Sequence, residues 1–292
     1  MVSSKLKRPD LGADLLDDLV AAALREDLGG ELGDTDITTH FVVDPDLMAE
    51  ARVIAKKAGV LSGSDAAARV FQVVNPPAEY SSLKPDGARI EAGEEAARVV
   101  GPLASILTAE RTALNFLQRL SGIATVTRRY ADGLAPYPGV TLLDTRKTTP
   151  GLRFLERSAV RAGGGHNHRE GLWDAILIKD NHVAAAGGVT EAINRARRAR
   201  MPIEVEVDTL EQLDEALAAG AEMILLDNMT SDLMQRAVEM TAGRARLEAS
   251  GGMTLEGAVA AAKVGVDRIS VGGLTHSAPA LDLSLEVIKT WR

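Results

Sequence analysis

The second half of the chain alternates short apolar runs with polar segments and with stretches in which apolar residues recur at helical spacing. The runs are dominated by consecutive Val, Ile and Leu residues, which is typical of parallel strands buried on both faces. Their starts are about 20 to 35 residues apart, the length of one strand, loop and helix. The predicted strands are 140–143, 175–178, 203–207, 223–226, 246–249 and 268–271. This alternation predicts an α/β fold, either a (β/α) barrel or a doubly wound open sheet.

Polar groups stand at the carboxyl end of every predicted strand. They are residues 144–147, Lys179, Glu206, Asp227, 250–252 and 272–273. The parallel strands of a (β/α) barrel place such ends on one face, where the active site is assembled. A dinucleotide-binding sheet has less support, because no Gly-x-Gly-x-x-Gly follows the first strand. We therefore predict a TIM-like, incomplete (β/α) barrel.

The first part of the chain has a different pattern, in which short strand-like runs are separated by Gly and Pro residues. A helix is predicted over 15–24, before Gly29-Gly30, and a longer one over 105–120 that ends at Ser121-Gly122. Strands are predicted at 51–55, 88–90 and 97–100. We predict an N-terminal α+β domain over 1–122, a barrel over 123–276, and a C-terminal segment, 277–292, that packs back on the N-terminal domain.

Composition narrows the class of protein. With 46% hydrophobic and 25% charged residues, the chain of 292 residues is typical of a globular protein. The net charge of −8 argues against nucleic acid or an anionic membrane as a partner. Cysteine is absent, which excludes disulfides, a thiolate nucleophile and cysteine-based metal sites. No apolar run approaches the roughly 18 residues of a membrane span. No signal peptide is recognisable either, so we expect a cytoplasmic protein.

One region departs from the acidic balance of the chain. Residues 144–179 contain seven Lys and Arg residues against four Asp and Glu residues. Crowded cations raise the energy of the folded chain unless an anion neutralises them. The region therefore predicts a site for a small polyanionic ligand.

Within this region, Arg146 and Lys147 follow a predicted strand and precede a turn-forming Thr-Thr-Pro-Gly sequence. Arginine binds carboxylate or phosphate through two parallel hydrogen bonds, and lysine acts as a point charge. Lys179 ends the most apolar strand and suits two roles, an anion ligand or a Schiff-base nucleophile. The sequence leaves both roles open.

Glycine and histidine residues lie between these cations. The amides of Gly163-Gly164-Gly165 either bind an anion or form a tight turn. His166 and His168 alternate, but no third ligand with suitable spacing lies nearby, which argues against a metal site. We expect His168 to donate a hydrogen bond to a ligand and His166 to be structural.

Carboxylates and glycine pairs end the remaining strands. Glu206 and Asp227 suit ribose hydroxyls or a magnesium ion that carries phosphates. Glu204 lies on the same face as Glu206 by strand alternation, but Glu206 is nearer the barrel mouth. The segments 250–252 and 271–273 end the last two strands, where barrels commonly bind phosphate through backbone amides.

Together these blocks resemble the quinolinate phosphoribosyltransferase family. The resemblance extends over nearly the whole chain, with one departure at Gly273, where the family pattern has alanine. The matching blocks are 25–29, 33–38, 110–125, 144–151, 161–169, 178–182, 225–228, 248–252 and 271–277.

The resemblance implies an enzyme that transfers the phosphoribosyl group of 5-phosphoribosyl 1-diphosphate to quinolinate. Pyrophosphate and CO2 are released, and nicotinate mononucleotide is formed for NAD biosynthesis. The implied ligands of the quinolinate carboxylates are Arg111, Arg146, His168, Arg169 and Lys179, with Thr145 and Lys147 also lining the site.

For the second substrate, the resemblance assigns the ribose hydroxyls and Mg2+ to Glu206 and Asp227. The implied ligands of the 5-phosphate are Ser250, Gly251, Gly252, Val271, Gly272 and Gly273. The implied catalytic residues are Lys147, Glu206 and Asp227. The family pattern also implies a homodimer, alone or within a hexamer, in which Arg111 enters the neighbouring subunit's barrel.

Three other functions compete with this interpretation. A related phosphoribosyltransferase-like protein of the kind associated with molybdenum transport is disfavoured by the intact Gly-Gly-Gly-His-Asn-His-Arg run, which a dicarboxylate site needs. A Schiff-base aldolase would use Lys179, and borohydride trapping would reveal it. A non-catalytic phosphate-binding barrel would not need every polar strand end that this chain retains.

Overall fold

The computed structural model describes residues 13–30 and 36–292, and the chain divides into two compact units. The first unit comprises Met1–Thr125 and Pro279–Arg292, and the second comprises Val126–Ala278. The matching block at 33–38 begins outside the described residues. No helix in the described ranges is both long and apolar enough to cross a membrane.

The first unit is built on an antiparallel four-stranded sheet with the order β12-β1-β5-β3. Its strands are β1 (Met48–Ala55), β3 (Glu79–Ser82), β5 (Glu95–Pro102) and β12 (Leu283–Trp291). Alternate residues of β1 are buried, so one face of this strand packs on the core. The C-terminal strand β12 pairs with β1 along its length, which places the end of the chain in the first unit. Two short strands, β2 (Gly59–Val60) and β4 (Arg89–Ile90), form a separate antiparallel pair.

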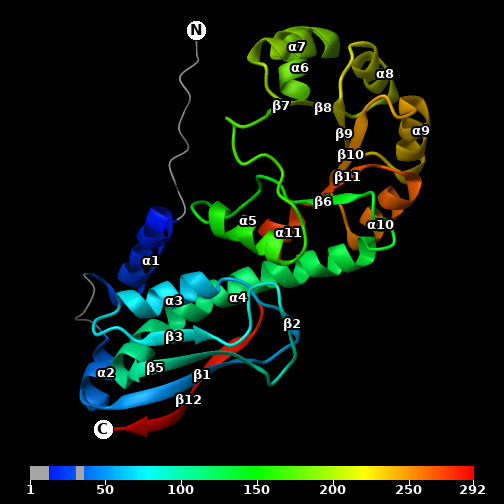
Figure 1. Ribbon diagram of the computed structural model, residues 1–292. Coiled ribbons are helices and arrows are strands. Elements are labelled where there is room, and N and C mark those ends of the chain that lie inside the picture. The colour runs from blue at the N-terminus through cyan, green and yellow to red at the C-terminus, as the bar shows by residue number, and fades with distance from the viewer. Residues whose placement is uncertain (1–12, 31–35) are drawn as a thin grey trace. The chain divides into compact units, whose positions relative to one another are not determined.

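Helices cover this sheet (Figure 1). They are α1 (Ala13–Leu28), α3 (Ser64–Val73) and the long α4 (Leu103–Leu134), and the short α2 (Ile37–Val42) lies at the end of the sheet. Leu24 of α1, Phe71 of α3 and Leu114 of α4 are fully buried in one apolar cluster with the sheet. The predicted helix before Gly29-Gly30 and the predicted α+β character of this region are confirmed.

The predicted end of the long helix at Ser121-Gly122 is wrong, because α4 continues to Leu134. Gly122 lies so close to a second segment that an added Cβ would be 2.1 Å from the carbonyl oxygen of Pro279. The Ser121 hydroxyl accepts the N–H of Ser62 and donates to its carbonyl. The Ser-Gly pair is therefore a close-packing site inside a helix and not a helix end.

The second unit contains a six-stranded parallel sheet with the order β6-β11-β10-β9-β8-β7. Its strands are β6 (Thr141–Leu143), β7 (Ile176–Ile178), β8 (Ile203–Val207), β9 (Met223–Asp227), β10 (Arg246–Ser250) and β11 (Arg268–Ser270). All six predicted strands are confirmed to within one residue at each end. In the described chain β6 and β7 do not pair, and His166 forms an isolated parallel bridge with Leu143 at the free edge of β6. The TIM-like barrel is thus incomplete, as predicted.

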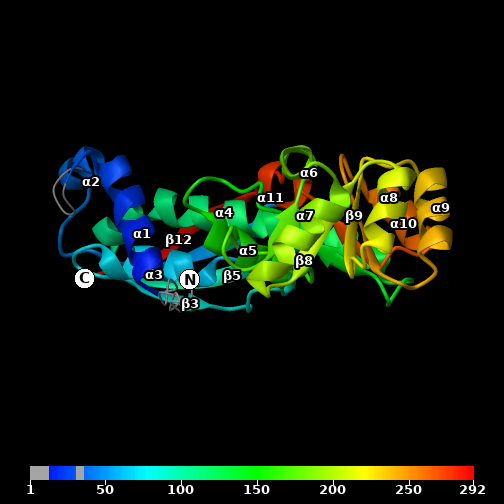
Figure 2. The same cartoon turned by 90° about the horizontal axis from the view of Figure 1, so that it is seen from above.

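Helices of the second unit lie on the outer side of this sheet (Figures 1 and 2). They are α5 (Arg153–Ala162), α6 (Asp180–Ala186), α7 (Val189–Ala196), the 3-10 turn η1 (Arg197–Ala199), α8 (Leu210–Ala218), α9 (Ser231–Thr241), α10 (Leu255–Val264) and α11 (Gly273–His276). Threonine side chains cap three of them: Thr209, Thr230 and Thr254 each accept a backbone N–H from the first turn. These caps end the loops that follow β8, β9 and β10.

Candidate active site

The parallel sheet brings the polar strand ends to one edge. Asp144 follows β6, Lys179 follows β7, and Asp227 and Ser250 are the last residues of β9 and β10. A hydrogen bond joins the ends of the neighbouring strands β9 and β10, because the Asn228 N–H donates to the Ser250 carbonyl at 3.0 Å. The predicted residues of the second unit that follow the strands therefore lie at one end of the sheet.

Lys179 and Glu206 form an ion pair at this end. The Lys179 Nζ lies 2.5 Å from Glu206 Oε2, and Glu206 is the more buried of the two. The Lys179 backbone N–H donates to His182 Nδ1 at 3.0 Å, which fixes the start of α6. The pair presents one ammonium and one carboxylate together, an arrangement that suits a ligand with both anionic and hydroxyl groups.

The two glycine segments that end β10 and β11 make close turns. Gly251 and Gly252 have φ values of 98° and 50°, and an added Cβ at Gly251 would lie 2.2 Å from Asn228 Oδ1. In the other segment the Val271 N–H donates to the Leu143 carbonyl at 2.9 Å. The Val271 amide is therefore used within the sheet, contrary to its predicted place among phosphate ligands.

Lys147 and Thr145 lie beside the second glycine segment. An added Cβ at Gly272 would lie 3.1 Å from Lys147 Cδ, and the Thr275 hydroxyl donates to the Lys147 carbonyl at 2.8 Å. The Thr145 hydroxyl accepts the Lys147 N–H at 3.1 Å. The Lys147 side chain is exposed next to this glycine segment.

The Gly163-Gly164-Gly165 run is a helix-ending turn. Each of its three N–H groups donates to a carbonyl at the end of α5, those of Ala159, Arg161 and Val160. All three N–H groups are therefore used within the chain, and the run forms a tight turn, one of the two alternatives that the sequence left open. His166, which follows, holds the edge of β6 through its backbone: its N–H donates to Leu142 and its carbonyl accepts from Asp144.

Two arginines of the cationic region, Arg146 and Arg169, lie near enough for the charge of one to act on the other. Arg146 Nε is buried and has no hydrogen-bond partner in the described part of the chain. Burial and the charge of Arg146 lower the pKa of Arg169. Arg169 Nη1 donates a hydrogen bond to the Ala175 carbonyl at 3.2 Å. The remaining donors of the two guanidinium groups suit a carboxylate ligand.

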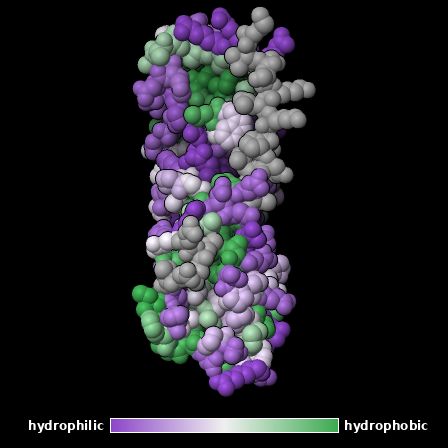
Figure 3. Space-filling model, turned by 90° about the vertical axis from the view of Figure 1, so that its left-hand side faces the viewer, coloured by the Kyte–Doolittle hydropathy of each residue, from purple (hydrophilic) through white to green (hydrophobic). Residues whose placement is uncertain are grey.

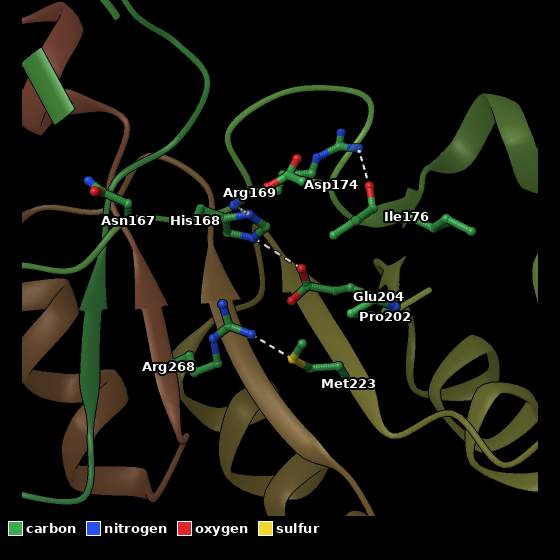
Figure 4. A pocket seen from close by; sticks show the side chains of 10 residues that line it. Asn167, His168, Arg169, Asp174, Ile176, Pro202, Glu204, Met223 and Arg268 are labelled. Atoms are coloured by element: carbon green, nitrogen blue, oxygen red, sulfur yellow. Dashed lines mark hydrogen bonds and ion pairs between the residues drawn. The ribbon is translucent and has the colours of Figure 1, made fainter. Parts of the chain in front are cut away.

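The His168 imidazole is held by two buried carboxylates. Its Nε2 lies 3.0 Å from Glu204 Oε2 and 3.2 Å from Glu248 Oε1. Figure 4 shows the ring pointing toward Glu204, with Arg268 beneath it on β11. Arg268 Nε in turn lies 3.1 Å from Glu248 Oε2. Four ionisable side chains thus form one network inside the barrel.

The surroundings of His168 contain groups that favour the neutral ring and groups that favour the charged ring. Its Nδ1 accepts the Arg169 N–H at 2.7 Å, a contact that only the neutral ring makes. Burial also disfavours the cation, but hydrogen bonds and charges from Glu204 and Glu248 favour it and raise the pKa of His168 to about 9. We expect the charged ring at neutral pH, because the two buried carboxylates favour it more strongly than one contact to an adjacent amide favours the neutral ring.

The sequence interpretation missed most of this network. Glu204 was considered only as a rival to Glu206, and Glu248 and Arg268 were not considered. A signal was present, because Glu248 stands between the apolar residues Leu247 and Ala249 at the centre of a predicted strand. The structure shows that Glu248 is fully buried. The predicted hydrogen bond from His168 to a ligand stays a prediction. In the structure, Nε2 faces Glu204 and Glu248, and Nδ1 faces the Arg169 N–H.

Three members of this network also resemble a metal site, because ligand atoms of His168, Glu204 and Glu248 lie within 4.8 Å of one another. Charge balance favours a proton instead. The His168 and Arg268 cations neutralise the two carboxylates, so a divalent ion would add uncompensated charge.

A cavity of about 250 Å3 adjoins this network and extends from Arg169 to the starts of the strands (Figure 4). Its lining residues are Asn167, His168, Arg169, Asp174, Ala175, Ile176, Pro202, Glu204, Met223 and Arg268. The last predicted ligand, Arg111, lies exposed on α4 in the first unit.

Comparisons with known proteins agree with these features. The family described as Quinolinate phosphoribosyl transferase, N-terminal domain, matches residues 36–121, and its C-terminal domain matches residues 123–286. The chain is 44% identical over 285 residues to a nicotinate-nucleotide pyrophosphorylase (carboxylating) of Mycobacterium leprae, covering 95% of this chain and 99% of that protein. A probable nicotinate-nucleotide pyrophosphorylase (carboxylating) of Bacillus subtilis is 44% identical over 260 residues, which are 88% of this chain and 89% of that protein. The solved nicotinate-nucleotide pyrophosphorylase of Francisella tularensis has a TM-score of 0.88 at 40% identity, covering 94% of this chain and 96% of that one.

Proposed function

Because the chain belongs to the quinolinate phosphoribosyltransferase family, we propose that it converts quinolinate and 5-phosphoribosyl 1-diphosphate to nicotinate mononucleotide, pyrophosphate and CO2. The observation that carries the proposal is the pair Arg146 and Arg169: Arg146 Nε has no hydrogen-bond partner within the described residues, and the charge of Arg146 acts on Arg169. A planar dicarboxylate supplies the acceptors that these donors lack.

The chemistry needs positioning and charge more than a nucleophilic side chain. The pyridine nitrogen of quinolinate attacks C1 of the ribose as the C1–oxygen bond to pyrophosphate breaks, through a cation-like sugar. The ring nitrogen is then positively charged, so the bond to the 2-carboxylate breaks with its electron pair left on C2. CO2 departs, and C2 takes up a proton from water. Holding both substrates in line provides much of the rate.

We assign the residues of this chain as follows. Arg146, Arg169 and Lys179 hold the two carboxylates and orient the ring nitrogen. Lys147, exposed beside Gly272, stabilises the charge of the departing pyrophosphate. The 5-phosphate lies on the glycine segments 250–252 and 272–273, of which Gly251 and Gly252 have left-handed backbone.

Glu206 and Asp227 bind the ribose hydroxyls and, through them, Mg2+. Their carboxylate oxygens are the donors that magnesium prefers, and the nearby Lys179 limits their negative charge. When bound, the ion supplies positive charge to the diphosphate leaving group.

The active unit in this proposal is a homodimer, alone or within a hexamer. Arg111 completes the dicarboxylate site of the partner subunit. Apolar side chains on α2 support an interface, since Ile37, Phe41 and Val42 are 70%, 79% and 76% exposed. On the face shown in Figure 3, apolar patches lie between hydrophilic side chains. We also propose that the protein is cytoplasmic.

Mass detection of nicotinate mononucleotide tests the function. The purified protein is mixed with quinolinate, 5-phosphoribosyl 1-diphosphate and MgCl2, and parallel reactions omit MgCl2 or replace quinolinate by nicotinate. We expect product only with quinolinate and magnesium, because nicotinate leaves site cations unpaired. Equal turnover of nicotinate and quinolinate would contradict the proposal.

A further inference from the structure

The backbone that carries His168 and Arg169 is held by two buried charged side chains. Asp144 Oδ1 accepts the His168 N–H at 2.7 Å. Arg157 donates from Nη2 to the His168 carbonyl at 2.7 Å and from Nη1 to the Arg169 carbonyl at 3.0 Å. Asp144 is 0% exposed and Arg157 is 6% exposed, so neither group exchanges these partners for water. One N–H and two successive carbonyls of the segment are thereby fixed.

Side-chain contacts extend this arrangement to Asn167. Its Nδ2 donates to Asp144 Oδ2 at 2.6 Å and to the Arg157 carbonyl at 3.1 Å. The two charges also lie near each other, with Arg157 Nη1 3.6 Å from Asp144 Oδ1. Burial raises the pKa of Asp144, and the charge of Arg157 and the hydrogen bonds from His168 and Asn167 oppose that shift. The pair is thus satisfied almost entirely by the segment 167–169.

The next turn of the segment is held in the same manner. Both carboxylate oxygens of Asp174 accept backbone N–H groups, that of Glu170 at 2.6 Å and that of Gly171 at 3.0 Å. The Arg169 guanidinium then reaches the Ala175 carbonyl within this held loop. The direction of the Arg169 side chain therefore depends on a backbone with little freedom to rotate.

We propose that Asp144 and Arg157 are positioning residues of the dicarboxylate site. They hold the peptide groups of His168 and Arg169 so that the Arg169 guanidinium meets a quinolinate carboxylate, and they do not touch the substrate. This inference rests on the proposed function. A buried ion pair contributes little net stability compared with apolar packing, which agrees with a role in fixing geometry.

The role predicts a selective kinetic effect. Apart from Lys147, the residues assigned to 5-phosphoribosyl 1-diphosphate lie at or directly after the ends of β8 to β11. Asp144 and Arg157 instead hold the backbone of the segment 167–169. Loosening that segment raises the KM for quinolinate and leaves the KM for 5-phosphoribosyl 1-diphosphate nearly constant. A purely structural role would lower the folded fraction and change both constants little.

The test compares Arg157→Met and Arg157→Lys with the wild-type protein. Methionine fills a similar volume without donors, and lysine is a single point charge that does not bridge two carbonyls in one plane. We expect the KM for quinolinate to rise about tenfold or more in Arg157→Met, by less in Arg157→Lys, and the other KM to stay within about twofold. Arg195→Met is the matched control, because Arg195 is exposed on α7 and forms an ion pair with the exposed Glu191 of the same helix.

Further measurements keep the outcomes distinct. If Arg157→Met does not fold, Arg157→Lys and Asp144→Asn carry the same comparison, with circular dichroism and calorimetry as folding checks. Absence of product with the wild-type protein would reject the proposed function. Activity in the wild type with equal changes of both KM values, or with no change of the quinolinate KM in folded variants, would reject the positioning role alone.

Discussion

The charge on His168 makes the stability of the second unit depend on pH in a specific window. The folded-state pKa is raised to about 9 by Glu204 and Glu248, against a value near 6.5 for a free histidine. The folded chain therefore binds more protons than the unfolded chain between these values. Stability from this group is fully present below pH 6.5 and is lost as pH rises through about 9.

The size of the effect follows from the shift. Each unit of pKa corresponds to about 1.4 kcal/mol, so the full loss is about 3 kcal/mol as an order of magnitude. The His168 side chain is only 11% exposed, so solvent screens the interaction weakly. Glu248→Gln removes one of the two carboxylates that favour the cation and brings the pKa of His168 back toward 6.5. The variant is less stable at pH 7, and its stability changes less between pH 7 and pH 9.

Two measurements check this prediction. Nitrogen-15 chemical shifts of the His168 ring report protonation directly, with Glu248→Gln identifying the signal by its shift. Urea unfolding at pH 6, 7.5 and 9 reports the stability of wild type and variant, with Glu191→Gln, an exposed carboxylate on α7, as control. A His168 ring that titrates at or below pH 6.5 in the wild type would refute the reasoning, because the carboxylates would then not determine its charge.

Three further predictions concern activity and packing. Arg169→Ala should fold normally and lose on the order of 2–5 kcal/mol of binding or transition-state stabilisation, measured as kcat/KM for quinolinate; wild-type kinetics would remove Arg169 from the site. Gly122→Ala should destabilise the first unit by about 1–3 kcal/mol in thermal unfolding, because the new methyl group meets the Pro279 carbonyl; an unchanged Tm would show that the two segments move apart freely. Arg111→Ala and Lys179→Ala, each inactive alone, should recover roughly a quarter of wild-type activity after complete subunit exchange, and no recovery despite verified exchange would exclude shared sites.

Local pattern was sufficient for much of the second unit. Strands buried on both faces need continuous apolar residues, so β6 to β11 were recognisable without any knowledge of their neighbours. Parallel strands also bring their carboxyl ends to one edge, so the polar residues after them were recognisable as a candidate site. The ion pair of Lys179 and Glu206 follows from two such ends on adjacent strands.

Features that depend on a distant contact required the tertiary structure. Gly122 has the local pattern of a helix end, yet its role comes from the Pro279 carbonyl, which lies far along the chain. Likewise the Val271 amide has the pattern of a phosphate ligand, but the Leu143 carbonyl of a strand distant in sequence occupies it. Sequence spacing contains no information on which backbone groups a folded neighbour already uses.

The buried charges depend most on the fold. His168, Glu204, Glu248 and Arg268 come from four separate segments, and each alone is an ordinary polar residue. Only the packing of the folded chain buries these side chains, and burial strengthens the electrostatic interactions between them and requires each charge to be paired. The sequence by itself therefore determined the strands and the kind of chemistry at their ends, and the tertiary structure decided which side chains meet the ligand and which hold those side chains in place.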